Sequence, residues 1–111
     1  PALCRVQLRK RRAVENHIGT VHAIAMANLC ELAAGMVTEV SLPPSMRWIP
    51  RGMTIEYLKP ARSDVTATAR LDRNEWSGAQ NVGVPVTVVD ATGTEVVRAV
   101  ITMYVSPRTP Q

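Results

Sequence analysis

Residues 21–40 constrain the fold of this 111-residue chain more than any other stretch. They are apolar on nearly every side of a helical projection, which predicts a helix that is buried all round. Thr20 precedes the stretch as a suitable N-cap, and Pro43 and Pro44 follow it, where proline cannot continue a helix. We therefore expect one long helix at the centre of the molecule.

Asn28, Glu31 and Glu39 interrupt this apolar stretch. The stretch is nearly long enough to cross a bilayer, but these side chains and the amphipathic sequence that follows favour a soluble protein without a membrane partner. A buried carboxylate without a partner costs several kcal/mol, so it is paired, protonated or used for chemistry. Glu31, in the middle of the helix, is therefore the first candidate for a functional residue.

The rest of the chain has the pattern of β-strands. Alternating apolar and polar residues predict half-buried strands at residues 2–10, 51–59, 64–72, 82–89 and 94–105. Residues 73–78 are a predicted turn, and Asp-Ala-Thr-Gly at 90–93 predicts a hairpin between the last two strands. Pro85 indicates a sheet edge or a bulge, because proline cannot donate a ladder hydrogen bond.

Together these elements predict an α+β fold, in which a five-stranded, mostly antiparallel sheet wraps one long buried helix. The length suits a single domain over residues 1–111. Strand-like sequence directly after Pro1 suggests that N-terminal residues of the natural protein are missing here. One helix cannot cover both faces of such a sheet, so a second copy should close what remains. We expect a homo-oligomer.

Composition argues against several classes of function. Cys4 and Cys30 lie in apolar sequence, which indicates reduced thiols and a cytoplasmic protein. The two histidines and two cysteines lack the paired spacing of a metal site, so no metal is expected. The net charge is +4, and the densest cationic cluster lies at residues 9–12. We interpret this cluster first as a solvated strand end, and next, with Lys59 and Arg62, as a site for the phosphates of a nucleotide-bearing ligand. Nucleic acid comes last and is not expected, because no aromatic residues are interleaved with the cluster.

Residues 16–23 are Asn-His-Ile-Gly-Thr-Val-His-Ala. This segment resembles the N-x-x-G-x-x-H-G-G signature of acyl-CoA thioesterases related to the phenylacetate-pathway and 4-hydroxybenzoyl-CoA enzymes. The order of strand, buried helix and wrapping antiparallel sheet is similar to their hotdog fold. The resemblance covers nearly the whole chain and fits a branch whose members are called thioesterases by similarity. It implies hydrolysis of an acyl-CoA or acyl-carrier thioester by a dimer or tetramer that needs no cofactor of its own.

The resemblance assigns catalytic roles to Glu31, Asn16 and His22. In this family an acidic residue follows the signature histidine by nine positions, and Glu31 stands nine positions after His22. Glu31 would act as general base on water or attack the thioester carbonyl itself. Asn16 would help to position the water or the thioester, and His22 would orient the site. Taken without the resemblance, Glu31 could instead be a buried acid paired with an arginine, Asn16 a turn former and His22 a capping residue.

The resemblance also assigns substrate-binding roles to Gly19, Ala23 and Ile24. Ala23 stands where a glycine of the family offers its backbone N–H to the thioester oxygen, and N–H groups at a helix start favour a developing oxyanion. Nine residues make about two and a half helical turns, so His22 and Glu31 lie toward opposite sides of one helix. In hotdog dimers the site is shared, with the acid of one chain facing the loop of the other, and the resemblance implies the same here.

Two departures from the family pattern bear on activity. Ala23 and Ile24 replace the usual Gly-Gly, which places side chains where the acyl group passes. Pro50 occupies the region where some relatives carry a catalytic serine. Two functions therefore stay open: an acyl-CoA thioesterase that uses Glu31, and a non-catalytic protein that binds acyl-CoA or another acyl ligand on the same scaffold.

Overall fold

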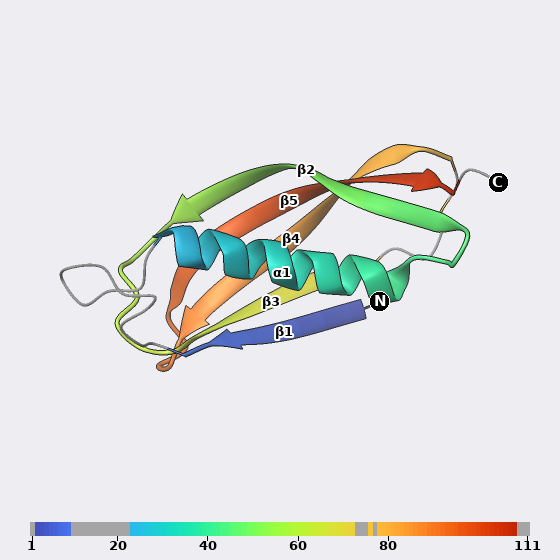
Figure 1. Cartoon of the computed structure of the whole chain (residues 1–111). Helices are drawn as coiled ribbons and strands as arrows, with labels where there is room; N and C mark the ends of the chain where they lie inside the picture. Colours follow the sequence, from blue (N-terminus) through green and yellow to red (C-terminus); the bar gives the residue numbers. More distant parts are fainter. Residues whose placement is uncertain (1, 10–22, 73–75, 77, 109–111) are drawn as a thin grey trace.

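The computed structural model describes residues 2–9, 23–72, 76 and 78–108. These residues form one helix and five strands (Figure 1). In chain order the elements are β1 (Ala2–Leu8), α1 (Ala23–Ser41), β2 (Met46–Tyr57), β3 (Val65–Leu71), β4 (Gln80–Asp90) and β5 (Glu95–Pro107). The predicted order of one strand, one long helix and four further strands is confirmed.

Strand β2 departs most from its prediction, because it begins at Met46 rather than at residue 51. The first half of β2 was not predicted, because proline is rare inside strands and Pro50 interrupts the alternating pattern. The proline is tolerated because β2 lies at an edge of the sheet, where one side of the strand has no ladder. The ladder to β5 shifts register between Pro50 and Gly52, so Arg51 is the extra residue of a β-bulge.

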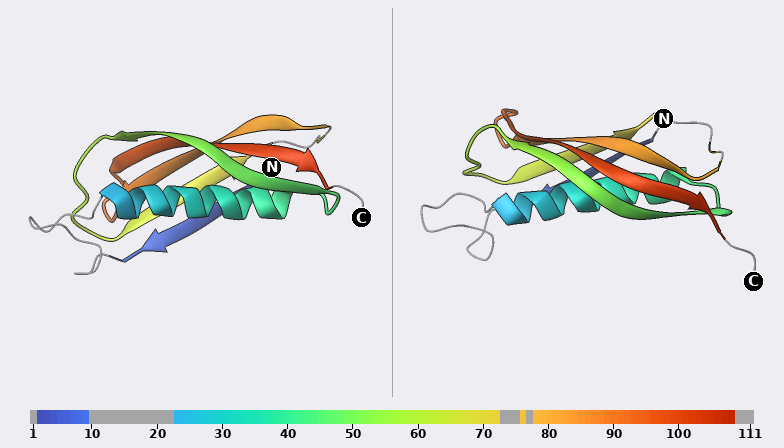
Figure 2. Two further views of the ribbon diagram at one scale, coloured as in Figure 1. Left: turned by 45° about the horizontal axis from the view of Figure 1, so that its top comes forward. Right: turned by 90° about the horizontal axis from the view of Figure 1, so that it is seen from above.

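The five strands form one antiparallel sheet in the order β1-β3-β4-β5-β2. Helix α1 lies along one face of the sheet, which curves around it so that the helix contacts every strand (Figure 1, Figure 2). β1 and β2 are the two edges within the described part of the chain. Pro85 marks a partial edge, as predicted: the ladder from β3 ends at Val86, and the earlier part of β4 pairs with β5 alone.

The core lies between α1 and the inner face of the sheet. Strand β3 shows the predicted alternation, with every second side chain buried. Because the chain has no phenylalanine, aliphatic side chains and methionine fill this layer. The largest fully buried ones include Val37, Val65, Val84, Val86, Val88, Ile101 and Met103. Thr38 is buried among them, and its hydroxyl donates to the Ala34 carbonyl oxygen at 2.7 Å, so its polar atom is satisfied.

The prediction that α1 is buried on every side is wrong. Four apolar side chains on the face turned away from the sheet are 45% to 75% exposed: Ile24, Leu32, Met36 and Val40. A single sheet covers only one face of a helix, and the sequence pattern does not show whether the same chain covers the other. Glu31 lies on this open face and is exposed, so the expectation of a buried carboxylate is also wrong for the single chain.

Helix α1 is long and apolar enough to cross a membrane by length and composition alone. The core helix of a globular domain passes the same test. The buried face of α1, which includes Leu29, Cys30, Ala33 and Val37, packs against the sheet as such a core helix does.

The hairpin between β4 and β5 forms at the predicted residues. The Asp90 carboxylate accepts hydrogen bonds from the Thr92 hydroxyl at 2.7 Å and from the backbone N–H of Thr94 at 3.0 Å. These donors lower the pKa of Asp90, because they stabilise its charged form. Gly93 has a φ of 84°, a conformation that residues with a side chain rarely adopt. The hairpin turn is therefore stabilised by the residues from which it was predicted.

Candidate active site

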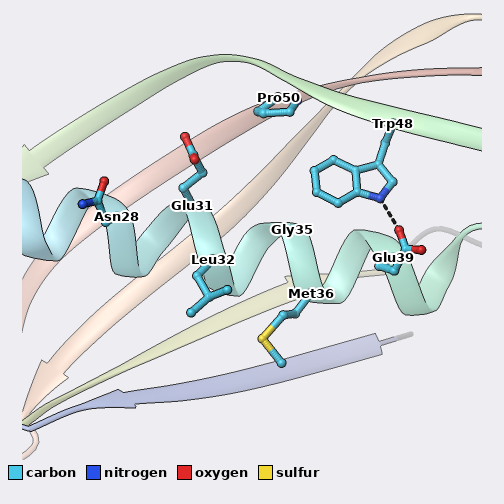
Figure 3. A pocket seen from close by; sticks show the side chains of 8 residues that line it. All are labelled: Asn28, Glu31, Leu32, Gly35, Met36, Glu39, Trp48 and Pro50. Carbon is cyan, nitrogen blue, oxygen red and sulfur yellow. Dashed lines mark hydrogen bonds between the residues drawn. The ribbon is translucent and has the colours of Figure 1, made fainter.

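A groove of about 540 Å³ runs between α1 and β2 on the open side of the helix (Figure 3). Its helical wall consists of residues that recur every three or four positions and so lie on one face of α1. The lining residues are Asn28, Glu31, Leu32, Gly35, Met36, Glu39, Trp48 and Pro50. The surface is mostly apolar, and its ionisable groups among the described residues are the two glutamates.

Glu31 stands in the middle part of this groove, and its carboxylate points toward the β2 side (Figure 3). Pro50 lies on the opposite wall. The bulge after Pro50 bends the edge strand beside the groove, and bulges are common next to functional sites. Since the proline side chain carries no acid or base, Glu31 is the titratable group at this point of the groove.

Glu31 makes no hydrogen bond and no ion pair within the described residues. The arginines of β2 contact other groups. Arg47 donates to the Ser106 hydroxyl at 3.5 Å, and the Arg51 guanidinium lies 5.2 Å from the centre of the Tyr104 ring. Both β5 partners alternate with buried residues, so these contacts lie on the sheet face away from α1. The ion-paired role that the sequence left open for Glu31 therefore has no partner in the described chain.

Trp48 closes one end of the groove. Its indole N–H donates to the Glu39 carboxylate at 2.5 Å (Figure 3). The ring packs over Gly35, where an added Cβ would lie 3.0 Å from the ring atom Cη2. The absence of a side chain at Gly35 thus lets the indole lie directly on the helix backbone.

Three predicted site residues, Asn16, Gly19 and His22, lie outside the described residues. Ala23 and Ile24 are described and begin α1, but neither lines the groove.

Strand β2 holds the start of the helix, because the Tyr57 hydroxyl donates to the Ala23 carbonyl oxygen at 3.0 Å. The first N–H groups of any α-helix have no partner inside the helix, so this end can bind an anion. Eight residues separate Ala23 from Glu31, which is about 12 Å along the axis. One chain alone therefore does not bring the proposed oxyanion donors to the carboxylate.

Sequence reasoning missed Gly35 and Glu39 as residues of the groove, and it treated Trp48 as a residue next to a turn that could line a pocket mouth. One signal was present: residues 31, 35 and 39 recur every four positions, which places them on one helix face. The partner across the groove could not be inferred in this way. Trp48 reaches the helix because β2 pairs with β5. The strand predicted here began at residue 51 and so did not include Trp48.

Within the described parts of the chain, no group of three His, Cys, Asp or Glu side chains is placed to hold a metal ion, and both histidines lie outside those parts. Cys4 and Cys30 are free thiols, as expected. Burial raises the pKa of the Cys30 thiol to about 11, because apolar surroundings disfavour the thiolate. Cys30 is therefore an unreactive core residue.

A family model described as a domain of unknown function, DUF4442, matches residues 1–105. The chain belongs to the DUF4442 family. Among curated proteins, no sequence match to this DUF4442 chain is found.

Solved structures resemble the DUF4442 chain over nearly its whole length. A crystal structure from structural genomics, APC5556, is 51% identical, with a TM-score of 0.90 over 97% of this chain and 73% of that one. The protein PA5026 of Pseudomonas aeruginosa, named a probable thioesterase, is 24% identical, with a TM-score of 0.87 over 97% of this chain and 78% of its own. The protein BH2602 of Bacillus halodurans, crystallised with CoA, is 24% identical, with a TM-score of 0.81 over 91% of this chain and 66% of its own. These similarities confirm the predicted hotdog fold.

Proposed function

We propose that this protein hydrolyses acyl-CoA thioesters and that Glu31 is its catalytic carboxylate. The observation that carries the proposal is the place of Glu31: a carboxylate without a partner among the described residues, in an apolar groove on the central helix of a hotdog fold. Proteins of similar structure include one named a probable thioesterase and one crystallised with CoA. The signature-like segment at residues 16–23 supports the same activity.

Thioester hydrolysis needs a base or a nucleophile beside the carbonyl carbon. Glu31 would take a proton from water as the water oxygen attacks that carbon, or would attack the carbon itself. The carbonyl oxygen then becomes negative, the C–S bond breaks, and the CoA sulfur takes up a proton, which Glu31 returns if it acted as base. If Glu31 itself attacked, the product is a mixed anhydride, and water hydrolyses it to release the acid and restore the carboxylate. An apolar groove favours this chemistry, because fixed dipoles act more strongly on developing charge where water is excluded.

The negative oxygen would be held by backbone N–H groups at a helix start, near Gly19, Ala23 and Ile24. In one chain Ala23 lies about 12 Å along the helix from Glu31. We therefore propose that a second copy of the chain supplies these groups, together with Asn16 and His22. The active site would then be complete only in a homo-oligomer.

Two features support a homo-oligomer. The open face of α1 carries exposed apolar side chains that a partner would cover. Strand β2 is a 12-residue edge strand with exposed Ile49 and Met53, which is a template for pairing with the same strand of a second copy. Sedimentation at micromolar concentration should show a stable dimer or tetramer. A stable monomer would contradict the shared site.

The phosphates of CoA are proposed to contact exposed Lys59 and Arg62, together with residues 9–12. Lys59 follows shortly after Tyr57, whose hydroxyl donates to Ala23 at the start of α1. Lys59 and Arg62 are therefore close in sequence to Tyr57, which contacts the end of α1 where the oxyanion is proposed to bind.

A non-catalytic acyl-ligand protein is the second candidate, and Ala23 and Ile24 in place of the family's two glycines favour it. A panel of acyl-CoA thioesters separates the two functions. Release of CoA is followed with a thiol reagent, and binding of the same thioesters is followed by calorimetry. A thioesterase should release CoA from at least one member with turnover. Saturable binding of several members without any release would contradict the proposal and favour the binding protein.

A further inference from the structure

Trp48 bounds one end of the groove between α1 and β2 (Figure 3). The Trp48 ring lies on the helix backbone at Gly35, and its N–H donates to Glu39 one turn further along α1 (Figure 3). The contact with Gly35 and the hydrogen bond to Glu39 both fix the ring against α1, so it is held in one orientation. The indole therefore forms a firm wall at this end of the groove.

The position of this wall limits how much of an acyl group fits beyond Glu31. Gly35, under the ring, is four residues beyond Glu31, which is about 6 Å along the helix axis. The thioester carbon must lie about 3–3.5 Å from the atom that attacks it. An acyl chain that runs along the groove toward Trp48 therefore meets the ring after only a few carbon atoms.

Charge in the groove limits the chemistry of the acyl group. Its lining contains two carboxylates, Glu31 and Glu39, and no cationic side chain among the described residues. An acyl group that ends in a carboxylate would meet like charges, which oppose binding. An uncharged chain would instead contact the apolar side chains of Leu32, Met36 and Trp48.

We propose that Trp48 determines the acyl-chain specificity of this protein, so that the groove accepts short, uncharged acyl groups such as butanoyl. The proposal rests on the proposed thioester hydrolysis, and it concerns which substrates that site selects. Trp48 is the residue that would touch the acyl group. Gly35 and Glu39 are positioning residues, because they act through the ring.

A series of acyl-CoA thioesters from acetyl to dodecanoyl tests the wall. We expect kcat/KM of the unaltered protein to rise with the first few carbons and to fall for longer chains. In Trp48→Leu the ring is gone, so kcat/KM should continue to rise, by about fourfold for each further methylene that becomes buried. Succinyl-CoA should be a much poorer substrate than butanoyl-CoA, although the two acyl groups are similar in length.

Variants of Glu39 test the hydrogen bond while keeping the ring. Glu39→Gln retains an acceptor for the indole N–H and should retain the short-chain preference. Glu39→Leu removes the acceptor and should shift the preference toward longer chains. Val100→Ala removes an exposed side chain from the outer face of β5 and serves as a control away from the groove. A merely structural role for Glu39 would lower the melting temperature of Glu39→Leu without changing the ratio between chain lengths.

The outcomes separate the wall from the proposed activity when binding of the same series is measured by calorimetry. If Trp48→Leu still hydrolyses thioesters with an unchanged chain-length profile, the proposed role of Trp48 is overturned and the proposed hydrolysis stands. If the protein hydrolyses none of the thioesters but Trp48→Leu shifts binding toward longer chains, the role of Trp48 in chain-length selection is supported. The proposed hydrolysis is then overturned. If Trp48→Leu does not fold, Glu39→Leu decides the question, and an unchanged preference in that variant overturns the wall.

Discussion

Gly35 offers a substitution in which two opposing effects can be compared. In an unhindered helix interior, replacing glycine by alanine stabilises a protein by roughly 0.5–1 kcal/mol. Here the new Cβ would lie 3.0 Å from Cη2 of Trp48, a ring that Glu39 holds in place. Overpacking of this kind typically costs about 1–3 kcal/mol. Because the cost is larger than the gain, Gly35→Ala should lower the free energy of unfolding by about 1 kcal/mol.

A double-mutant cycle with Trp48→Leu isolates the cause. A leucine leaves room for the new Cβ, so in this background Gly35→Ala should stabilise by roughly 0.5–1 kcal/mol. The change of sign corresponds to a coupling energy of about 1.5–2 kcal/mol, within the range observed for residues in contact.

Urea unfolding of the four proteins, followed by circular dichroism at one fixed protein concentration, measures the coupling. If Gly35→Ala changed the free energy of unfolding equally in both backgrounds, the packing of Trp48 on Gly35 would be refuted.

Two further predictions concern pH and ligand charge. The free energy of unfolding should fall between pH 9.0 and about 11, because the unfolded protein loses the Cys30 proton at lower pH than the folded protein does. The loss should be about 2–3 kcal/mol and should be absent from the pH dependence of Cys30→Ala, which is checked by unfolding both proteins across this range. Reversing the charge of Lys59 and Arg62 to glutamate should raise KM for acyl-CoA with little change in kcat. An unchanged KM would remove both residues from the phosphate site.

Those parts of the fold that depend on local sequence could be predicted. Strand β3 and the turn at residues 90–93 follow from side-chain alternation and from turn residues, which are properties of a few neighbouring positions. The first half of β2 could not be predicted in this way, because Pro50 interrupts its pattern and only the edge position makes the proline acceptable. The open face of α1 could not be predicted from local sequence either, because it depends on how much of the helix the sheet covers.

Part of the candidate site could be predicted from the sequence. The position of Glu31 on the central helix follows from the apolar pattern of residues 21–40. The groove itself depends on Trp48, which the pairing of β2 with β5 carries to Gly35. No local pattern predicts a contact between a helix and a distant strand, since it is set by the register of the whole sheet. The roles of Asn16, Gly19 and His22 stay predictions, because these residues lie outside the described chain.

Turnover and melting temperature of the single variant Glu31→Gln test the central claim most directly. Glu31 is exposed and has no partner in the described chain, so the substitution should change the free energy of unfolding by less than about 0.5 kcal/mol. Glutamine keeps the shape of the side chain but cannot act as a base or nucleophile, so kcat/KM should fall about a hundredfold or more. Glu56→Gln, on the exposed outer side of β2, is the matched control and should retain turnover. A folded Glu31→Gln protein that binds acyl-CoA and turns it over at the original rate would contradict the account.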